Sequence, residues 1–258
     1  MHFYKYQGTG NDFVMIDDRE RRFNLNNSVL VKQLCDRRFG IGADGLILLR
    51  LCHEANFEMI YYNSDGKISS MCGNGGRCIA RFAQHLKIID THCTFKAVDG
   101  LHSATLNDQE VALKMNDVTQ IERTNDAYFL NTGSPHWIEY TKTIATMNVE
   151  EEGKKIRNNE RFRSEGVNVN FIQAEKDIVK IRTYERGVEG ETLSCGTGIT
   201  AAAIAHAIHS KFTPGGHTIR LASDGGELMV KFDFDGAHSF TEIFLIGPAE
   251  KSFEGDVQ

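Results

Sequence analysis

The amino-acid sequence predicts an α+β protein with two pseudo-symmetric lobes, each a curled, mostly antiparallel sheet around a central helix. The strand patterns come in hairpins and do not alternate with helices as they would in a doubly wound sheet. A Cys-Gly-x-Gly motif occurs twice, at Cys72 and at Cys195, and a helical pattern follows each motif, over 78–86 and 199–208. One central helix per half is therefore expected, with a cysteine close to its start.

The two motifs belong to an internal repeat with a spacing of 123 residues. At this spacing the segment 9–14 aligns with 132–137, and 61–63 aligns with 184–186. Several short matches at nearly one spacing are hard to obtain by chance, so an internal duplication is the simplest explanation.

The duplication predicts two domains. The N-terminal lobe is expected over 1–116, with the tail 247–258 returning to it, and the C-terminal lobe over 117–246. The polar segment 116–126 is the expected connection. By length alone, 258 residues suit either two domains or one large domain.

In the N-terminal half, two strands flank a glycine-rich turn at 8–12, and a helix is expected over 29–38. Asn27 and Ser28 cap this helix, and Gly40 stops it. Its buried face is formed by Val31, Leu34 and Cys35. Strands are expected over 3–6, 13–16, 46–49, 57–62, 94–98, 101–106 and 110–115.

In the C-terminal half, Asn148 caps a helix expected over 149–157, which has three glutamates in its first turn. The helix after Cys195 is rich in alanine from Ala201 to Ala207, so we expect it to be deeply buried. Strands are expected over 167–173, 178–184, 218–222, 227–232 and 240–246.

The composition argues against a nucleic-acid-binding or membrane protein. The formal net charge is −6 and the isoelectric point is near 5.9, which does not suit a general nucleic-acid binder. No apolar run is long enough to span a bilayer. The first residues lack the layout of an export signal, so the six cysteines are expected to be reduced thiols in the cytoplasm.

Cys72 and Cys195 are the candidates for chemistry. Each precedes a glycine at a helix start, where backbone N–H groups and the helix dipole lower a thiol pKa and can bind a carboxylate. Their spacing from other cysteines and histidines suits neither a redox pair nor a zinc site. The other cysteines are expected to be small buried hydrophobic residues, and they are Cys35, Cys52, Cys78 and Cys93.

Two such thiols suit proton transfer at carbon: a thiolate removes a proton from one face, and a thiol returns a proton to the other. An amino-acid α-proton is weakly acidic, so carboxylate binding and exclusion of water are also needed. Candidate supporting residues lie near the repeated motifs, and they are Asn11, Ser134, His136, Asn63, Glu185 and Arg186. A structural role is the alternative for His136.

The chain resembles the diaminopimelate epimerases. The similarity covers essentially the whole chain and is carried by YQGTGNDFVMID (6–17), GIGADGLI (40–47), YNSDG (62–66), MCGNGGR (71–77), and ERG (185–187) followed by ETLSCGTG (191–198). It implies two similar lobes with the active site in the cleft, no cofactor and no metal. It further implies interconversion of LL- and meso-diaminopimelate in the cytoplasm, for lysine and peptidoglycan synthesis.

By matching motif, the resemblance makes Cys72 and Cys195 the proton donor and acceptor, assisted by His136 and Glu185. The implied substrate contacts are Asn11, Asn63, Gly73, Asn74, Asn168, Glu185, Arg186, Gly196 and Thr197. The expected partner is a small amino-acid substrate, with no nucleic acid and no membrane, and a homodimer is a possible assembly.

This chain departs from the family pattern at Ser134, where asparagine is frequent, and at Gly45, where some members have glutamine. The nearest alternative function is a proline or hydroxyproline racemase, which shares the paired cysteines. Arg186 and the asparagines favour a substrate with a second charged end. A phenazine-type isomerase, a thiol redox protein and a non-catalytic binding module are further alternatives.

Overall fold

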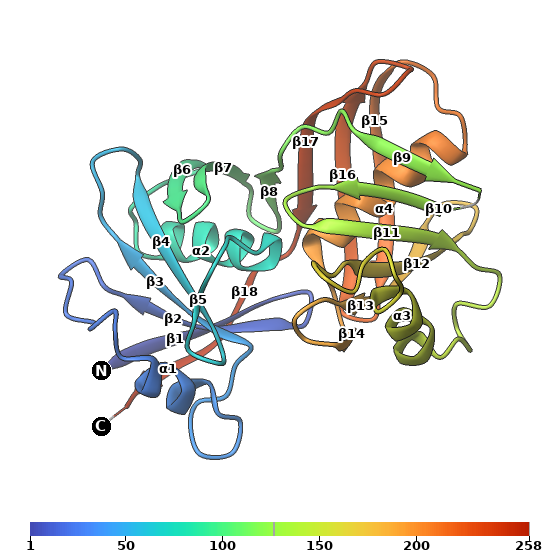
Figure 1. The fold of residues 1–258 in the computed structure, drawn as a ribbon. Helices are drawn as coiled ribbons and strands as arrows, with labels where there is room; N and C mark the ends of the chain where they lie inside the picture. Colours follow the sequence, from blue (N-terminus) through green and yellow to red (C-terminus); the bar gives the residue numbers. More distant parts are fainter. Residues whose placement is uncertain (126, 258) are drawn as a thin grey trace. The chain divides into compact units, whose positions relative to one another are not determined.

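The computed structural model describes residues 1–125 and 127–257, and the chain forms two compact units (Figure 1). Unit 1 consists of Met1–Leu113 with Gly247–Gln258, and unit 2 consists of Lys114–Ile246. Each unit is a curled, open sheet that packs around one long helix, as predicted for the α+β class.

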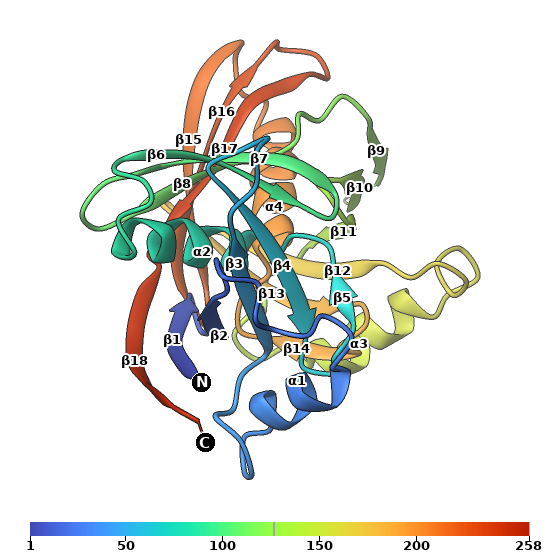
Figure 2. The same ribbon diagram turned by 90° about the vertical axis from the view of Figure 1, so that its left-hand side faces the viewer.

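Unit 1 packs its sheet against α2 (Gly73–His85). The strands neighbour one another in the order β18, β1, β2, β3, β4, β6, β7, β8, and β5 lies beside β4. Pairing is antiparallel except for β2 with β3 and β4 with β6. The strands are β1 His2–Gly8, β2 Asn11–Asp17, β3 Gly45–Arg50, β4 Phe57–Asn63, β5 Ile68–Ser69, β6 His92–Ala97, β7 Gly100–Leu106, β8 Val111–Lys114 and β18 Glu250–Asp256. Figure 2 shows β18 running alongside β1, close to both chain ends.

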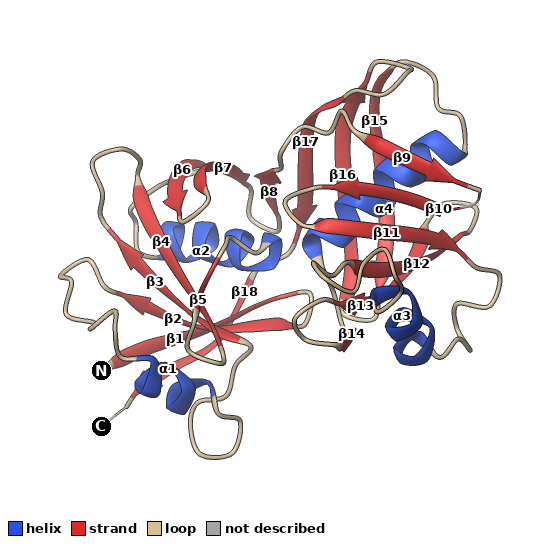
Figure 3. Cartoon of the chain, viewed as in Figure 1, coloured by secondary structure: helices blue, strands red, loops and turns tan. Residues whose placement is uncertain are grey.

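Unit 2 packs its sheet against α4 (Gly196–His209), while α3 (Val149–Arg157) lies against β12 to β14 (Figure 3). The strands follow the order β9, β10, β11, β12, β13, β15, β16, β17, and β14 lies beside β13. The parallel pairs are β11 with β12 and β13 with β15. The strands are β9 Ile121–Thr124, β10 Ala127–Asn131, β11 Pro135–Tyr140, β12 Asn168–Ala174, β13 Val179–Glu185, β14 Gly190–Thr192, β15 Gly215–Ser223, β16 Gly226–Phe234 and β17 Phe240–Gly247.

The two units have the same strand order and the same parallel pairs, which confirms the internal duplication. The register agrees with the predicted spacing, because Phe13 is opposite Gly45 in unit 1 and His136 is opposite Asn168 in unit 2. One alignment is wrong by a residue. Leu46 is opposite Tyr62 and Val169 is opposite Tyr184, so the counterpart of Asn63 is Glu185 and not Arg186.

Both central helices begin earlier than predicted. The glycine-rich stretches after the cysteines were excluded from the predicted helices, yet α2 starts at Gly73 and α4 starts at Gly196. Close packing explains the glycines: a Cβ at Gly75 would lie 3.1 Å from Ile47 Cδ1, and one at Gly198 would lie 2.5 Å from Asn170 Oδ1. As predicted, α4 is buried on nearly all sides, and Ala201 is among its fully buried residues.

The helix between β2 and β3, α1 (Ser28–Cys35), has the predicted cap, because the Asn27 side chain accepts a hydrogen bond from the backbone N–H of Leu30. Its buried residues are Val31, Leu34 and Cys35, as predicted. The predicted end near residue 38 is wrong. Asp36 has an extended backbone and accepts hydrogen bonds from the N–H groups of Arg38 and Phe39, so the helix stops before Gly40. The bounds and the cap of α3 are as predicted.

The strands that the sequence missed are β9, β10, β11 and β18, together with the short β5 and β14. The tail was predicted to return to the N-terminal lobe, but not as a strand. The segment 116–126 was predicted to be a connection, but β9 occupies part of it. The internal repeat contained the missing information, since β1 and β2 project onto β10 and β11 at the same spacing.

Three of the four remaining cysteines are fully buried, as predicted. Burial raises the pKa of Cys35 and Cys78 to about 12 and that of Cys93 to about 11. Cys52 is only half-buried and donates to Ala55 O. Among the described residues the longest helix, α4, has 14 residues, and none qualifies as a membrane span.

Candidate active site

Cys72 and Cys195 occupy the same position in the two units, the N-cap of the central helix. Both residues have an extended backbone, and neither side chain caps its own helix. The first N–H groups of a helix have no partner within the helix, and together with the helix dipole they favour an anion. Each unit therefore presents a thiol beside a potential carboxylate-binding position.

In unit 1, the Cys72 thiol lies beside Asn11 at the start of β2. Cys72 Sγ donates to Asn11 Oδ1 over 3.6 Å, and Asn74 Nδ2 donates to the same oxygen over 3.3 Å. On its other side, Asn11 Nδ2 donates to Asp44 Oδ2 over 2.7 Å. Because a carboxylate only accepts hydrogen bonds, Asp44 fixes the Asn11 amide with its oxygen toward the thiol.

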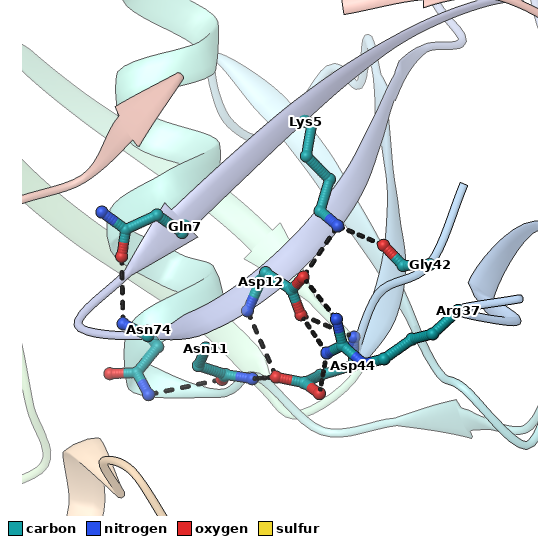
Figure 4. A network of polar contacts seen from close by, with 9 residues as sticks. Lys5, Gln7, Asn11, Asp12, Arg37, Gly42, Asp44 and Asn74 are labelled. Atoms are coloured by element: carbon teal, nitrogen blue, oxygen red, sulfur yellow. Dashed lines mark hydrogen bonds and ion pairs between the residues drawn. The ribbon is translucent and has the colours of Figure 1, made fainter. Parts of the chain in front are cut away.

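A network of charges holds Asp44 and Asn11 in place (Figure 4). Arg37 forms ion pairs with Asp12 at 2.7 Å and with Asp44 at 2.8 Å, and Lys5 pairs with Asp12 at 2.7 Å. Lys5 also donates to Gly42 O. Burial would raise the pKa of Asp12, but hydrogen bonds from Arg37 and Lys5 outweigh it and hold the pKa at about 2. The Asp12 carboxylate is therefore charged at neutral pH.

Arg77, in the first turns of α2, is a fully buried cation. It donates to Thr9 Oγ1 in the β1–β2 turn, to Gly73 O, and to Pro248 O before β18. Arg77 thus ties the start of α2 to two neighbouring segments of unit 1.

In unit 2, the Cys195 thiol lies beside a hydroxyl. Cys195 Sγ is 3.5 Å from Thr197 Oγ1, and His136 Nε2 is 2.9 Å from the same hydroxyl oxygen. Thr132 Oγ1 donates to Thr197 O over 2.8 Å, which anchors the first turn of α4. The structure therefore connects His136 to Cys195 through Thr197.

His136 is completely buried. Burial, together with the nearby positive charge of Arg186, lowers the pKa of His136 to about 3. The imidazole is therefore neutral at pH 7. A neutral imidazole has one donor nitrogen and one acceptor nitrogen, so its neighbours decide which nitrogen carries the proton.

Ser134, Asn168 and Arg186 form one cluster. Asn168 Nδ2 donates to Ser134 Oγ over 2.9 Å, and Arg186 donates to the same oxygen over 3.3 Å. Asn168 Oδ1 accepts from the backbone N–H of Arg186 over 2.8 Å. The serine is thus an acceptor for both neighbours, and the exposed guanidinium is held at the end of β13.

The other predicted site residues lie at strand and helix ends. Glu185 ends β13 and accepts from Thr192 Oγ1 over 3.0 Å, and its counterpart Asn63 is exposed at the end of β4. Gly73 and Gly196 are the first residues of the two central helices. Gly45, the other departure from the family pattern, lies against Tyr61, because a Cβ would be 2.5 Å from Tyr61 Cε2.

Sequence reasoning missed Asp44 and Asn170. Asp44 lies in a glycine-rich loop that has no phosphate-binding motif. Asn170 is two residues from Asn168 in the buried strand β12, so both side chains point to the same face. Two asparagines at this spacing in a mostly apolar strand are the sequence signal for a polar pair on one face.

Among the described residues, no group of three or more His, Cys, Asp or Glu side chains is arranged to hold a metal ion.

The fold is shared with a class of solved structures. A phenazine biosynthesis protein of the PhzF family from Bacillus anthracis matches with a TM-score of 0.79 at 12% identity, covering 100% of this chain and 99% of that chain. A probable proline racemase from Agrobacterium radiobacter matches with a TM-score of 0.70 at 15% identity, covering 100% and 92%. At such low identity these structures show the fold alone.

The sequence comparisons are more specific. The family model for diaminopimelate epimerase matches residues 3–121 and 128–252. Diaminopimelate epimerase from Flavobacterium psychrophilum is 50% identical over 256 residues, covering 98% of this chain and 99% of the relative. The Chlorobaculum tepidum enzyme of the same name is 42% identical over 260 residues, covering 97% and 98%. The chain therefore belongs to the diaminopimelate epimerase family, and it is an isomerase.

Proposed function

We propose that this protein is a cofactor-independent epimerase that interconverts LL- and meso-diaminopimelate. The observation that carries the proposal is the duplicated helix N-cap: a thiol stands at the same position of the same fold in each unit. Family membership supports the choice of substrate. The reaction would serve lysine and peptidoglycan precursor synthesis.

The two thiols act in opposite protonation states. One cysteine, as a thiolate, takes the α-proton from one face of the substrate carbon, while the other, as a thiol, gives a proton to the opposite face. The helix N–H groups around Gly73, Asn74, Gly196 and Thr197 bind the reacting carboxylate and offset its charge. His136 and Glu185 assist the thiols, and Glu185 also binds the substrate ammonium group.

The remaining polar residues bind the distal amino-acid end. The Arg186 guanidinium is suited to a carboxylate. Ser134 accepts a hydrogen bond from this guanidinium, and Asn168 accepts one from the Arg186 backbone N–H. Asn11 and Asn63 complete the substrate contacts. Epimerisation of only one centre requires that this distal end be recognised as a fixed L centre.

A cytoplasmic location is part of the proposal, because the mechanism needs reduced thiols. The free thiols of Cys35, Cys52, Cys78 and Cys93 support it.

The test is deuterium uptake from heavy water. Purified protein should introduce deuterium at one α-carbon of diaminopimelate and interconvert the LL and meso isomers. L-Proline and trans-4-hydroxy-L-proline are the matched controls and should show no uptake. Turnover of proline without turnover of diaminopimelate would contradict the proposal.

A further inference from the structure

Asn170 is a completely buried polar side chain on β12, in the part of unit 2 that lies under the start of α4. Its Nδ2 group donates to Trp137 O over 3.1 Å and to Asn168 O over 3.3 Å. Its Oδ1 accepts from Thr183 Oγ1 over 2.9 Å. Backbone carbonyls only accept hydrogen bonds, so these partners fix which end of the amide carries the N–H groups.

The fixed orientation of the Asn170 amide determines which ring nitrogen of His136 carries the proton. Asn170 Nδ2 is also 3.1 Å from His136 Nδ1. Nδ2 has two hydrogens for three neighbouring acceptor atoms, so one hydrogen is shared, and Nδ2 itself cannot accept. A protonated Nδ1 would therefore place two donors face to face, and Nδ1 is the unprotonated nitrogen. The proton of the neutral ring is therefore on Nε2.

The tautomer of His136 in turn determines which hydrogen-bonding group Thr197 presents to the Cys195 thiol. His136 Nε2–H donates to Thr197 Oγ1 over 2.9 Å, so the hydroxyl oxygen already accepts one hydrogen bond. The hydroxyl hydrogen of Thr197 is then directed toward Cys195 Sγ, at 3.5 Å. A donor that points at sulfur stabilises the thiolate relative to the thiol.

Unit 1 shows that the fold itself does not need these polar groups. At the matching positions it has Phe13 and Ile47, both fully buried. A Cβ at Gly75 would meet Ile47 Cδ1 at 3.1 Å and Phe13 Cζ at 3.5 Å, whereas a Cβ at Gly198 would meet Asn170 Oδ1 at 2.5 Å and His136 Cε1 at 3.4 Å. An apolar pair thus fills this space in unit 1, so a requirement of packing does not explain the polar pair in unit 2.

We propose that Asn170, oriented by the backbone carbonyls of Trp137 and Asn168, is a positioning residue of the epimerase: it holds His136 as the Nε2–H tautomer, so that Thr197 presents its hydroxyl hydrogen to Cys195. This inference rests on the proposed function and deepens it. Asn170 acts on the reaction only through His136 and Thr197.

The test is the tautomer of His136, measured from the ¹⁵N shifts of its ring nitrogens at pH 7 and assigned with His136→Gln. The wild-type protein should show a protonated Nε2 and a bare Nδ1. Asn170→Asp replaces the donor at Nδ1 with a carboxylate oxygen, so the proton should move to Nδ1. Asn170→Leu should give a mixture of tautomers, because it removes the donor beside Nδ1 but keeps the approximate shape of the side chain.

Turnover provides a second readout. Both variants should lower kcat by about 10-fold or more and change KM by less than about threefold, since they disturb the reacting thiol and not the substrate contacts. Thr200→Val is the matched control. Thr200 is a completely buried hydroxyl in α4 that donates to Gly196 O, whereas the His136 ring nitrogens lie against Thr197 and Asn170, so its removal should leave the tautomer unchanged.

A wild-type His136 with its proton on Nδ1 would overturn the inference. So would an Asn170→Asp protein that keeps both the Nε2–H tautomer and wild-type turnover. If the buried carboxylate of Asn170→Asp prevents folding, Asn170→Leu decides, because an Asn170→Leu protein that keeps both the Nε2–H tautomer and wild-type turnover would also overturn the inference. If the wild-type protein does not epimerise diaminopimelate, the proposed function fails, and the tautomer measurement still decides whether Asn170 controls His136.

Discussion

Unit 1 and unit 2 share one topology but differ in what lies under the first turn of the central helix. In unit 1, Phe13 and Ile47 fill this space, and in unit 2, His136 and Asn170 fill it. The comparison distinguishes the requirements for placing a cysteine at the helix start from the requirements for controlling its protonation. Holding a cysteine at a helix N-cap needs only close packing against glycine, whereas controlling the proton of that cysteine needs polar neighbours.

The immediate neighbours of the two thiols differ in the same way. Cys72 Sγ donates to Asn11 Oδ1, an acceptor whose orientation Asp44 fixes. Cys195 Sγ lies beside the Thr197 hydroxyl, which His136 contacts from its other side. A fixed acceptor favours a protonated thiol and a directed donor favours a thiolate, so duplication followed by divergence can supply the two protonation states that a two-base reaction requires.

The largest expected effect comes from removing either thiol. Cys72→Ala and Cys195→Ala should each lower kcat for diaminopimelate by at least about 10³-fold, because in the proposed mechanism each cysteine carries the proton on its side of the substrate. Circular dichroism should show that both variants fold. Cys52→Ala, which removes a half-buried thiol elsewhere in unit 1, should retain full activity. Near-normal turnover in either alanine variant would show that the two thiols do not form a pair.

Acid should destabilise the protein partly through His136, because the unfolded chain binds a proton at this residue more readily than the folded protein does. The matching residue of unit 1, Phe13, has no ionisable group and cannot have this effect. The unfolded histidine binds a proton below its ordinary pKa of 6.5, while the folded one stays neutral to about pH 3. Stability is therefore fully present above pH 6.5 and is lost as the pH falls toward 3. Between pH 7 and pH 4.5, His136→Gln should lose about 2–3 kcal/mol less unfolding free energy than the wild type, measured with urea. Equal losses would mean that His136 is not held neutral.

Asp44→Asn tests the fixed acceptor of unit 1. Asp44 directly precedes β3, and unit 2 has the buried Val167 directly before β12. An asparagine at residue 44 can donate as well as accept, so Asn11 is no longer forced to turn its oxygen toward Cys72. We expect kcat to fall by about 10-fold through misplacement of this amide. Asp65→Asn, in an exposed turn, is the control. Equal activities of the two variants would show that Asp44 has no role in the site.

The smallest effects are expected at α1 and α3, the helices that connect equivalent strands in the two units. The helix α1 connects β2 to β3, and α3 connects β11 to β12. Asn27→Ala and Asn148→Ala each remove a side-chain cap, and each should cost about 1 kcal/mol of stability. Turnover at 25 °C should not change, because neither helix carries a site residue. Loss of activity without loss of stability in either variant would show that a crossover helix takes part in the site.

Local signals predicted much of the fold and the main site residues. The caps at Asn27 and Asn148, the alanine-rich α4, most strands of both sheets and the two cysteine motifs follow from short-range patterns. The strands β9 to β11 and β18 were missed because they are short or polar in part. The starts of α2 and α4 were missed because glycine has a low helix propensity. In both cases tertiary packing outweighed the local preference.

The sequence by itself determined that the protein is a duplicated α+β chain with a thiol at the start of each central helix, since repeats and caps are local features of a chain. Only the tertiary structure decided which polar groups reach those thiols. His136 and Asn170 are 34 residues apart, and His136 and Thr197 are 61 apart. Such contacts depend on the register of β11 with β12 and on how closely Gly198 lets α4 approach the sheet. Neither can be predicted from a short segment of the sequence.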